Sequence, residues 1–178
     1  MAQKYNSNVV FPKDSSYIIR CLDVVFAPSN AGNPMLSFEY EIVSPETVEI
    51  AGEEYNIAGT KLRTWQVVKT MDGDVVDTAK TDKNETDTKK LVAAFGGDPE
   101  TFDLTNPDLS VFKGKSVYAL LYNDEQDQRK SPTAAQLKAG QKQGDVLLHP
   151  ITKQPLKRNY PKIGEIFALA PVTSGTAY

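Results

Sequence analysis

The sequence predicts a mostly β fold: an OB-fold-like Greek-key β-barrel of five strands, with one short helix between strands three and four. Five segments are rich in β-branched and aromatic residues, whereas only one shows a clear helical spacing of apolar residues. The chain has 178 residues, of which 40% are hydrophobic, so it can bury one core. We expect a single domain over residues 1–178, with a basic loop insertion at 126–162 before the last strand and a flexible tail at 170–178.

The first two predicted strands form a hairpin. Residues 17–26 are almost continuously apolar, as in a largely buried strand. Residues 27–34 contain Ser, Asn, Gly and Pro, which favour a turn. In residues 35–43 every second side chain from Leu36 to Ile42 is apolar and the side chains between them are Ser or Glu, which indicates a half-buried strand.

The third predicted strand, residues 61–68, carries the most informative face. Its alternation places Lys61, Arg63 and Trp65 together on one side, with Leu62 on the other. Cations beside an aromatic ring suit a single-stranded nucleic acid, because the cations neutralise phosphates and the ring stacks on bases. The alternative is that Trp65 faces the core while the cations extend past it to solvent.

One helix is expected over residues 85–95, where apolar residues from Leu91 to Phe95 form a stripe. Asn84 or Thr86 is its expected N-cap, and two glycines end it.

The last two predicted strands are residues 115–122 and 163–169. Tyr118 and Tyr122 share a face with Leu120, so we expect at least one of the two tyrosines in the core. Five strands with a helix between the third and the fourth are the element order of an OB-fold barrel. A jelly roll or a β-sandwich is the alternative.

The charge of the chain is unevenly distributed. Its net charge is -3, but residues 126–164 hold eight Lys or Arg and two Asp, a net +6, so the rest carries -9. Such asymmetry indicates a polyanionic partner, or else a solvated basic loop without a partner. The candidate contact residues in this segment are Arg129, Lys130, Lys157, Arg158, Tyr160 and Lys162, to which Lys115 is added from the fourth strand.

The composition disfavours catalysis. The chain has one cysteine, Cys21, and one histidine, His149, so it can form neither an internal disulfide nor a Cys/His zinc site. A Cys21–His149 dyad is disfavoured because Cys21 lies in an apolar strand. We expect a protein that is not an enzyme and needs no cofactor or metal. The polar N-terminal residues and the absence of a long apolar run predict a cytoplasmic protein without a membrane segment.

The chain resembles the phage-encoded single-stranded DNA-binding proteins with an OB-fold. The resemblance spans about residues 10–169 and rests on residues 17–22, 29–42, 89–96, 112–117 and 159–163. It implies sequence-tolerant DNA binding in replication or recombination, in the host cytoplasm and without catalysis. Replication proteins would be further partners, although many members recruit them through an acidic C-terminal tail and residues 169–178 contain no acid.

Two other functions remain open. The chain is a candidate virion structural or assembly protein, in which self-association would pair the basic loop with the acidic stretch 39–54 of a neighbour. A small-molecule enzyme would need a polar pocket near His149.

Overall fold

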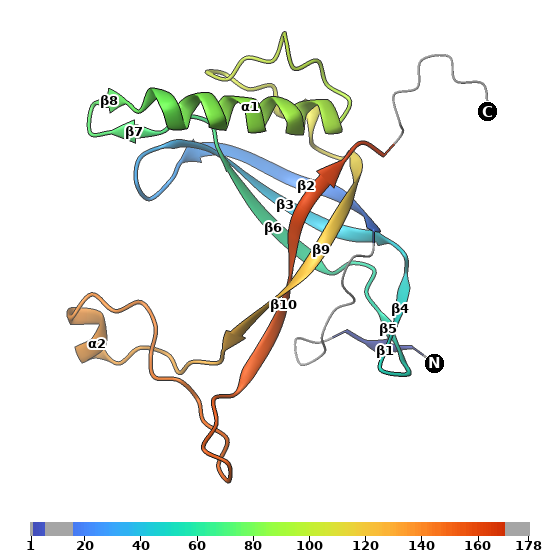
Figure 1. The fold of residues 1–178 in the computed structure, drawn as a ribbon, viewed down its shortest axis with the longest axis vertical. Coiled ribbons are helices and arrows are strands. Elements are labelled where there is room, and N and C mark those ends of the chain that lie inside the picture. Colours follow the sequence, from blue (N-terminus) through green and yellow to red (C-terminus); the bar gives the residue numbers. More distant parts are fainter. Residues whose placement is uncertain (1, 6–15, 170–178) are drawn as a thin grey trace.

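The computed structural model describes residues 2–5 and 16–169, and five long strands form its main sheet (Figure 1). The strands are β2 (Ser16–Pro28), β3 (Pro34–Ser44), β6 (Lys61–Val67), β9 (Ser116–Asp127) and β10 (Lys157–Phe167). They pair antiparallel in the order β10-β9-β2-β3-β6. The mostly β prediction is therefore confirmed. The predicted tail, residues 170–178, lies outside the described residues.

The predicted β-barrel is not closed. In the described part of the chain no strand pairing joins the two edge strands, β6 and β10. The sheet is nevertheless curled, so that β6 and β10 lie side by side, and the pairing pattern makes them run in the same direction.

Smaller elements surround this sheet. A second sheet consists of β1 (Gln3–Lys4), β5 (Glu53–Asn56) and β4 (Thr47–Ile50), and a short hairpin consists of β7 (Met71–Asp72) and β8 (Val75–Val76). The helices are α1 (Thr78–Ala94), η1 (Leu109–Val111) and α2 (Ala134–Lys138).

Helix α1 begins seven residues earlier than the sequence predicts. Its N-cap is Asp77, whose side chain accepts a hydrogen bond from the backbone N–H of Lys80 at 3.1 Å, and not Asn84 or Thr86. In the added turns a threonine takes the inward position in place of an apolar residue. Thr81 is buried, and its hydroxyl donates to the Thr70 carbonyl at 3.4 Å.

The core lies between the inner face of the curled sheet and α1, which lies across one end of the sheet (Figure 1). Phe112 is its centre. Its ring is fully buried and packs edge-to-face on Phe38 of β3 at 5.1 Å and on Phe95, just after α1, at 5.3 Å between centroids. Phe112 therefore joins the helix to the sheet.

Strand β9 turns the opposite face inward from the one that we expected. Tyr118 and Tyr122 are 37% and 49% exposed, whereas the residues of the other face, Val117, Ala119 and Leu121, are buried. Both faces of this strand are apolar, so alternation alone cannot choose between them. Pairing with β2 determines which face of β9 points inward, because the buried Tyr17 lies opposite Ala119.

Residues 128–156 form an arm that projects from the end of the β9–β10 hairpin, away from α1 (Figure 1). Backbone hydrogen bonds continue the hairpin into the arm, such as Gln128 N–H to the Leu156 carbonyl at 2.8 Å. A capping box at Thr133 begins α2. Within the arm only Gly144 is buried, so hydrogen bonds and not a core determine its shape.

Replacing Phe112 with Ala should lower the free energy of unfolding by about 3–5 kcal/mol, because it leaves a cavity where three aromatic rings meet. Urea unfolding followed by circular dichroism measures this loss. Val75→Ala is the control, since Val75 is exposed and the change should stay within about 0.5 kcal/mol. Equal stability of the two variants would contradict Phe112 as the centre of the core.

Candidate functional site

The outer face of β6 carries the three residues that the sequence singled out. Lys61, Arg63 and Trp65 point away from the core, while Leu62 between them is buried. The Trp65 side chain is 58% exposed. The alternative orientation, with Trp65 in the core, is therefore wrong.

Acidic residues compensate the cations of this face. In the register of β3 and β6, Glu39 lies opposite Arg63 and Glu41 lies opposite Lys61. Arg63 Nη2 lies 3.4 Å from Glu39 Oε2, and Glu41 is ion-paired with Arg20 of β2. A polyanion arriving here would have to replace existing ion pairs, so this face offers aromatic surface more than net positive charge.

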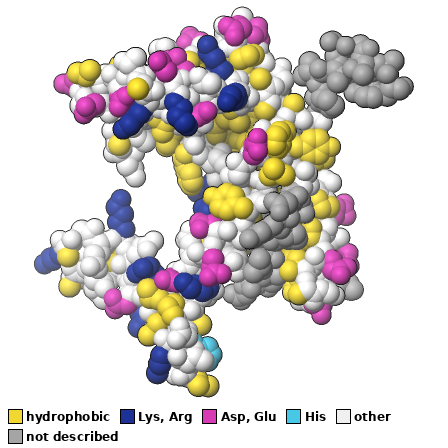
Figure 2. All heavy atoms as spheres, in the orientation of Figure 1, with side chains coloured by type: hydrophobic (Ala, Val, Ile, Leu, Met, Phe, Trp, Pro, Cys, Tyr) yellow, Lys and Arg dark blue, Asp and Glu magenta, His cyan; other side chains and the backbone are white. Residues whose placement is uncertain are grey.

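A second cluster of cations lies where the arm leaves the sheet. We call it the arm-root pocket, a cavity of about 330 Å³. Four cations and one aromatic ring line it: Arg129, Lys130, Lys142, Arg158 and Tyr160. Among the described residues, none of these four cations forms an ion pair. In Figure 2 the arm is the lower lobe, where Lys and Arg side chains gather beside a hollow that separates it from the lobe of α1.

At this pocket the backbone of the arm folds back on itself, and Gly144 is the point of closest approach. A side chain at this position would come within 2.4 Å of the Lys130 carbonyl, so only glycine allows the two backbones to approach. Their contact is a hydrogen bond from Gly144 N–H to the Lys130 carbonyl at 3.0 Å. The Gly144 carbonyl in turn accepts from Arg129 Nη1 at 3.2 Å, which orients that guanidinium.

Lys157 is not available to a ligand in the way the sequence suggested. Its ammonium is ion-paired with Asp127, directly opposite in the β9–β10 register. The hydrogen bond to Asp127 raises the pKa of Lys157 above its usual value. Asp127 is the carboxylate among the described residues that line the arm-root pocket, and this pair neutralises it, so within this part of the chain the charge of the other four cations is left uncompensated.

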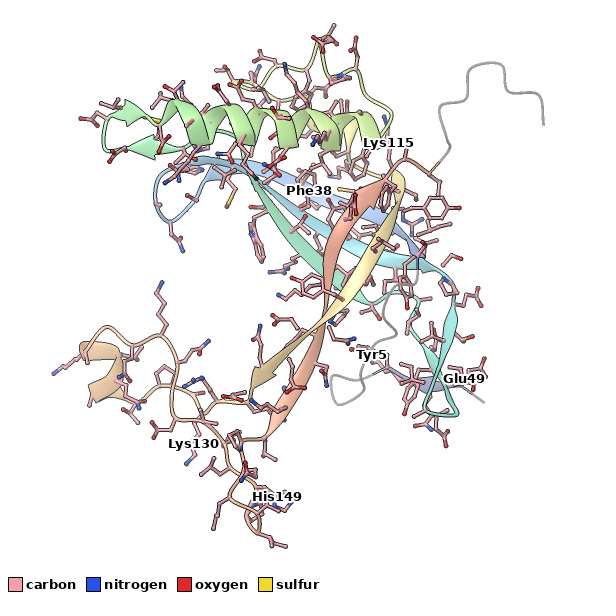
Figure 3. All side chains as sticks on the ribbon, viewed as in Figure 1. Tyr5, Phe38, Glu49, Lys115, Lys130 and His149 are labelled. Atoms are coloured by element: carbon pink, nitrogen blue, oxygen red, sulfur yellow. The ribbon has the colours of Figure 1, made fainter. Side chains whose placement is uncertain are left out.

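The remaining predicted residues are divided between two places. Tyr160 is 37% exposed, and Lys162 follows two residues later on the same side of β10. Lys115 lies near the end of α1, far from Lys130 in the arm (Figure 3), so it is not part of the arm-root pocket. The sequence pattern does not point to two further residues: nothing local in it distinguishes Lys142 from other exposed lysines, and it makes Tyr122 a core candidate.

The Cys21–His149 dyad does not exist. Cys21 is buried in β2, whereas His149 lies in the arm (Figure 3), where its Nδ1 accepts hydrogen bonds from the backbone of Ile151 and Thr152. No group of three or more His, Cys, Asp or Glu within residues 2–5 and 16–169 could hold a metal ion.

Cys21 should resist thiol reagents in the folded protein. Burial raises its pKa to about 11, so at pH 8 the thiol stays protonated, and only the thiolate reacts. Labelling with a chromogenic disulfide should be slow in buffer and complete within minutes in urea, and a Cys21→Ser variant supplies the blank. Equally fast labelling with and without urea would show that β2 is not held in the core.

No helix in the described part of the chain combines the length and the apolar character that crossing a membrane requires. No protein-family model matches the chain, and a search of curated proteins gave no match either. Support for a function therefore comes from the geometry and charge of the residues themselves.

Proposed function

We propose that this protein binds single-stranded DNA with little dependence on sequence and without catalysis. The observation that carries the proposal is the arm-root pocket, where four cations that form no ion pair within residues 2–5 and 16–169 surround one exposed tyrosine. Phosphates would be neutralised by Arg129, Lys130, Lys142 and Arg158, and a base would stack on Tyr160. The resemblance to phage single-stranded DNA-binding proteins extends the proposal to DNA replication or recombination in the host cytoplasm, with replication proteins as partners.

The topology supports an OB-fold. That fold is a five-stranded, partly open Greek-key barrel. Here β2 pairs with β3 and β9, and β9 pairs with β10. Helix α1 lies between the third and fourth long strands, and the OB-fold barrel is commonly partly open, as between β6 and β10. Its loop between strands four and five, which binds oligonucleotides in many members, corresponds to the arm.

Charge and exposed rings together favour a single strand over a duplex. Bases stack on an aromatic ring only where they are unpaired, and Trp65 and Tyr160 are both exposed. The acidic rest of the chain, with its net -9, would repel the polyanion from other surfaces and so direct it to the arm.

An assembly protein is the second candidate, and one observation favours it. The β4–β5 hairpin is acidic, with Glu49 directly opposite Glu54, and it lies on the other side of the molecule from the basic arm (Figure 3). Head-to-tail pairing of these charges would build a chain of subunits. Light scattering without DNA tests this candidate, since a large defined assembly favours it and a small particle counts against it.

Fluorescence titration with oligo-dT at several salt concentrations tests the DNA-binding proposal. The chain has one tryptophan, so quenching at Trp65 reports on the β6 face directly. Affinity should fall steeply with salt, because binding releases counterions from the DNA phosphates and added salt opposes that release. The double change Arg129→Ala and Arg158→Ala should weaken binding and reduce the salt slope by about 1.4, since single strands lose about 0.7 per phosphate contact.

The matched control removes two lysines, Lys80→Ala and Lys83→Ala, from α1, where both are ion-paired with aspartates. It changes the net charge equally and should leave the salt slope unchanged. Equal effects of the two double changes would mean that binding follows net charge and not the arm-root pocket. Absence of binding at about 50 mM salt would refute the proposed function itself.

A further inference from the structure

The outer face of the β9–β10 hairpin carries a feature that the arm-root pocket does not include. In the register of this pair, Lys162 lies directly opposite Tyr122 and Tyr160 lies opposite Asp124. Residues opposite each other in an antiparallel pair share one face. Tyr122 and Lys162 thus lie on the same face as Tyr160 and Arg158, which line the arm-root pocket.

The ring of Tyr122 is supported on one side and open on the other. The β9–β10 pairing skips Gly164, and the Tyr122 ring lies beside this glycine. A Cβ atom added at Gly164 would be 3.4 Å from Tyr122 Cδ1 and 3.9 Å from Cε1. Even so, Tyr122 is 49% exposed. An aromatic side chain held by the backbone beneath it and open to solvent is suited to stacking on a base.

Gly164 also connects this face to β6. A cavity of about 390 Å³ lies between the two edge strands and α1, and its lining includes Gly164 and Glu165 of β10 and Trp65 of β6. The two exposed rings, Tyr122 and Trp65, therefore flank the same short stretch of β10.

The charged residues of the outer β9–β10 face define how far a surface suited to a polyanion extends. Between Arg158 and Lys162, which are about 13 Å apart along the strand, Asp124 is the acid facing outward from β9. Beyond Lys162 the face carries Glu165, and Tyr118 lies opposite Phe167 with no cation across from it. Tyr118 and Tyr122 are thus two exposed tyrosines on the same face of the same strand, but only Tyr122 faces a lysine.

We propose that Tyr122 and Lys162 form a second binding subsite for single-stranded DNA, in which a base stacks on Tyr122 and its phosphate meets Lys162. The bound strand would run from the arm-root pocket along β10 toward Trp65. This inference rests on the proposed function, because it assumes that the arm-root pocket holds the preceding nucleotides.

Oligo-dT titrations of four proteins test it: the unchanged protein, Tyr122→Ala, Tyr122→Phe and Tyr118→Ala. Tyr122→Ala should weaken binding by about fivefold to a hundredfold with an unchanged salt slope, because it removes stacking and no charge. Tyr122→Phe keeps the ring and should bind like the unchanged protein. Tyr118→Ala should also bind like it. Thermal unfolding of all four confirms equal folding, since both tyrosines are outside the core.

The outcomes separate this inference from the proposed function. If the unchanged protein binds with a steep salt slope and Tyr122→Ala binds equally well, the subsite is refuted while DNA binding stands. If Tyr122→Phe loses as much affinity as Tyr122→Ala, the hydroxyl and not the ring is responsible, and stacking is refuted. If Tyr118→Ala weakens binding as much as Tyr122→Ala, the lysine opposite Tyr122 has no special role. If the unchanged protein does not bind, the proposed function fails first.

Discussion

The long pairing of β9 with β10 is the constraint on which the rest of this molecule depends. Near α1 these strands are part of the core, where Leu121 is buried and Ile163, opposite it, packs against the core. Toward the arm the same ladder continues to Lys157 opposite Asp127, beyond the cover of the other strands. One continuous ladder thus fixes the arm to the core and determines which side chains of β10 face outward.

Two clusters of cations on this protein differ in their surroundings more than in their number. The β6 cations lie beside carboxylates of β3, and exposed ion pairs of this kind contribute little free energy but cancel the local potential. In the arm-root pocket the one lining carboxylate, Asp127, is already paired with Lys157. The remaining positive potential is therefore concentrated at the arm, although the sequence suggested that both clusters would contribute.

Local patterns were sufficient for much of the fold. The alternation from Leu36 to Ile42 correctly identified the inner face of β3, and the same rule placed Trp65 outside. It failed for β9, where both faces are apolar and pairing with β2 decides the orientation. It also missed the first turns of α1, since the buried Thr81, whose hydroxyl bonds to the Thr70 carbonyl, takes the place of an apolar residue there.

The arm-root pocket could be predicted only in part, because its residues are distant in the sequence. The excess of Lys and Arg in residues 126–164 indicated that the segment is basic. Which cations come together depends on hydrogen bonds that fold the arm back, such as Lys130 N–H to the Asp145 carbonyl at 2.9 Å. The pairing of Lys157 with Asp127 likewise depends on the register of β9 and β10, which the sequence pattern does not specify.

The shape of the arm has a consequence for how the molecule loses structure. Since Gly144 is the one buried residue of the arm, the arm has almost no apolar surface to expose on opening, and its backbone amides should exchange with solvent far faster than those of β2 or β3. Local opening of the arm would cost little free energy and would not disturb the packing around Phe112. Insertions or deletions at its tip would similarly leave the folding of the sheet intact. The arm can therefore change in length and charge while the domain that carries it stays the same.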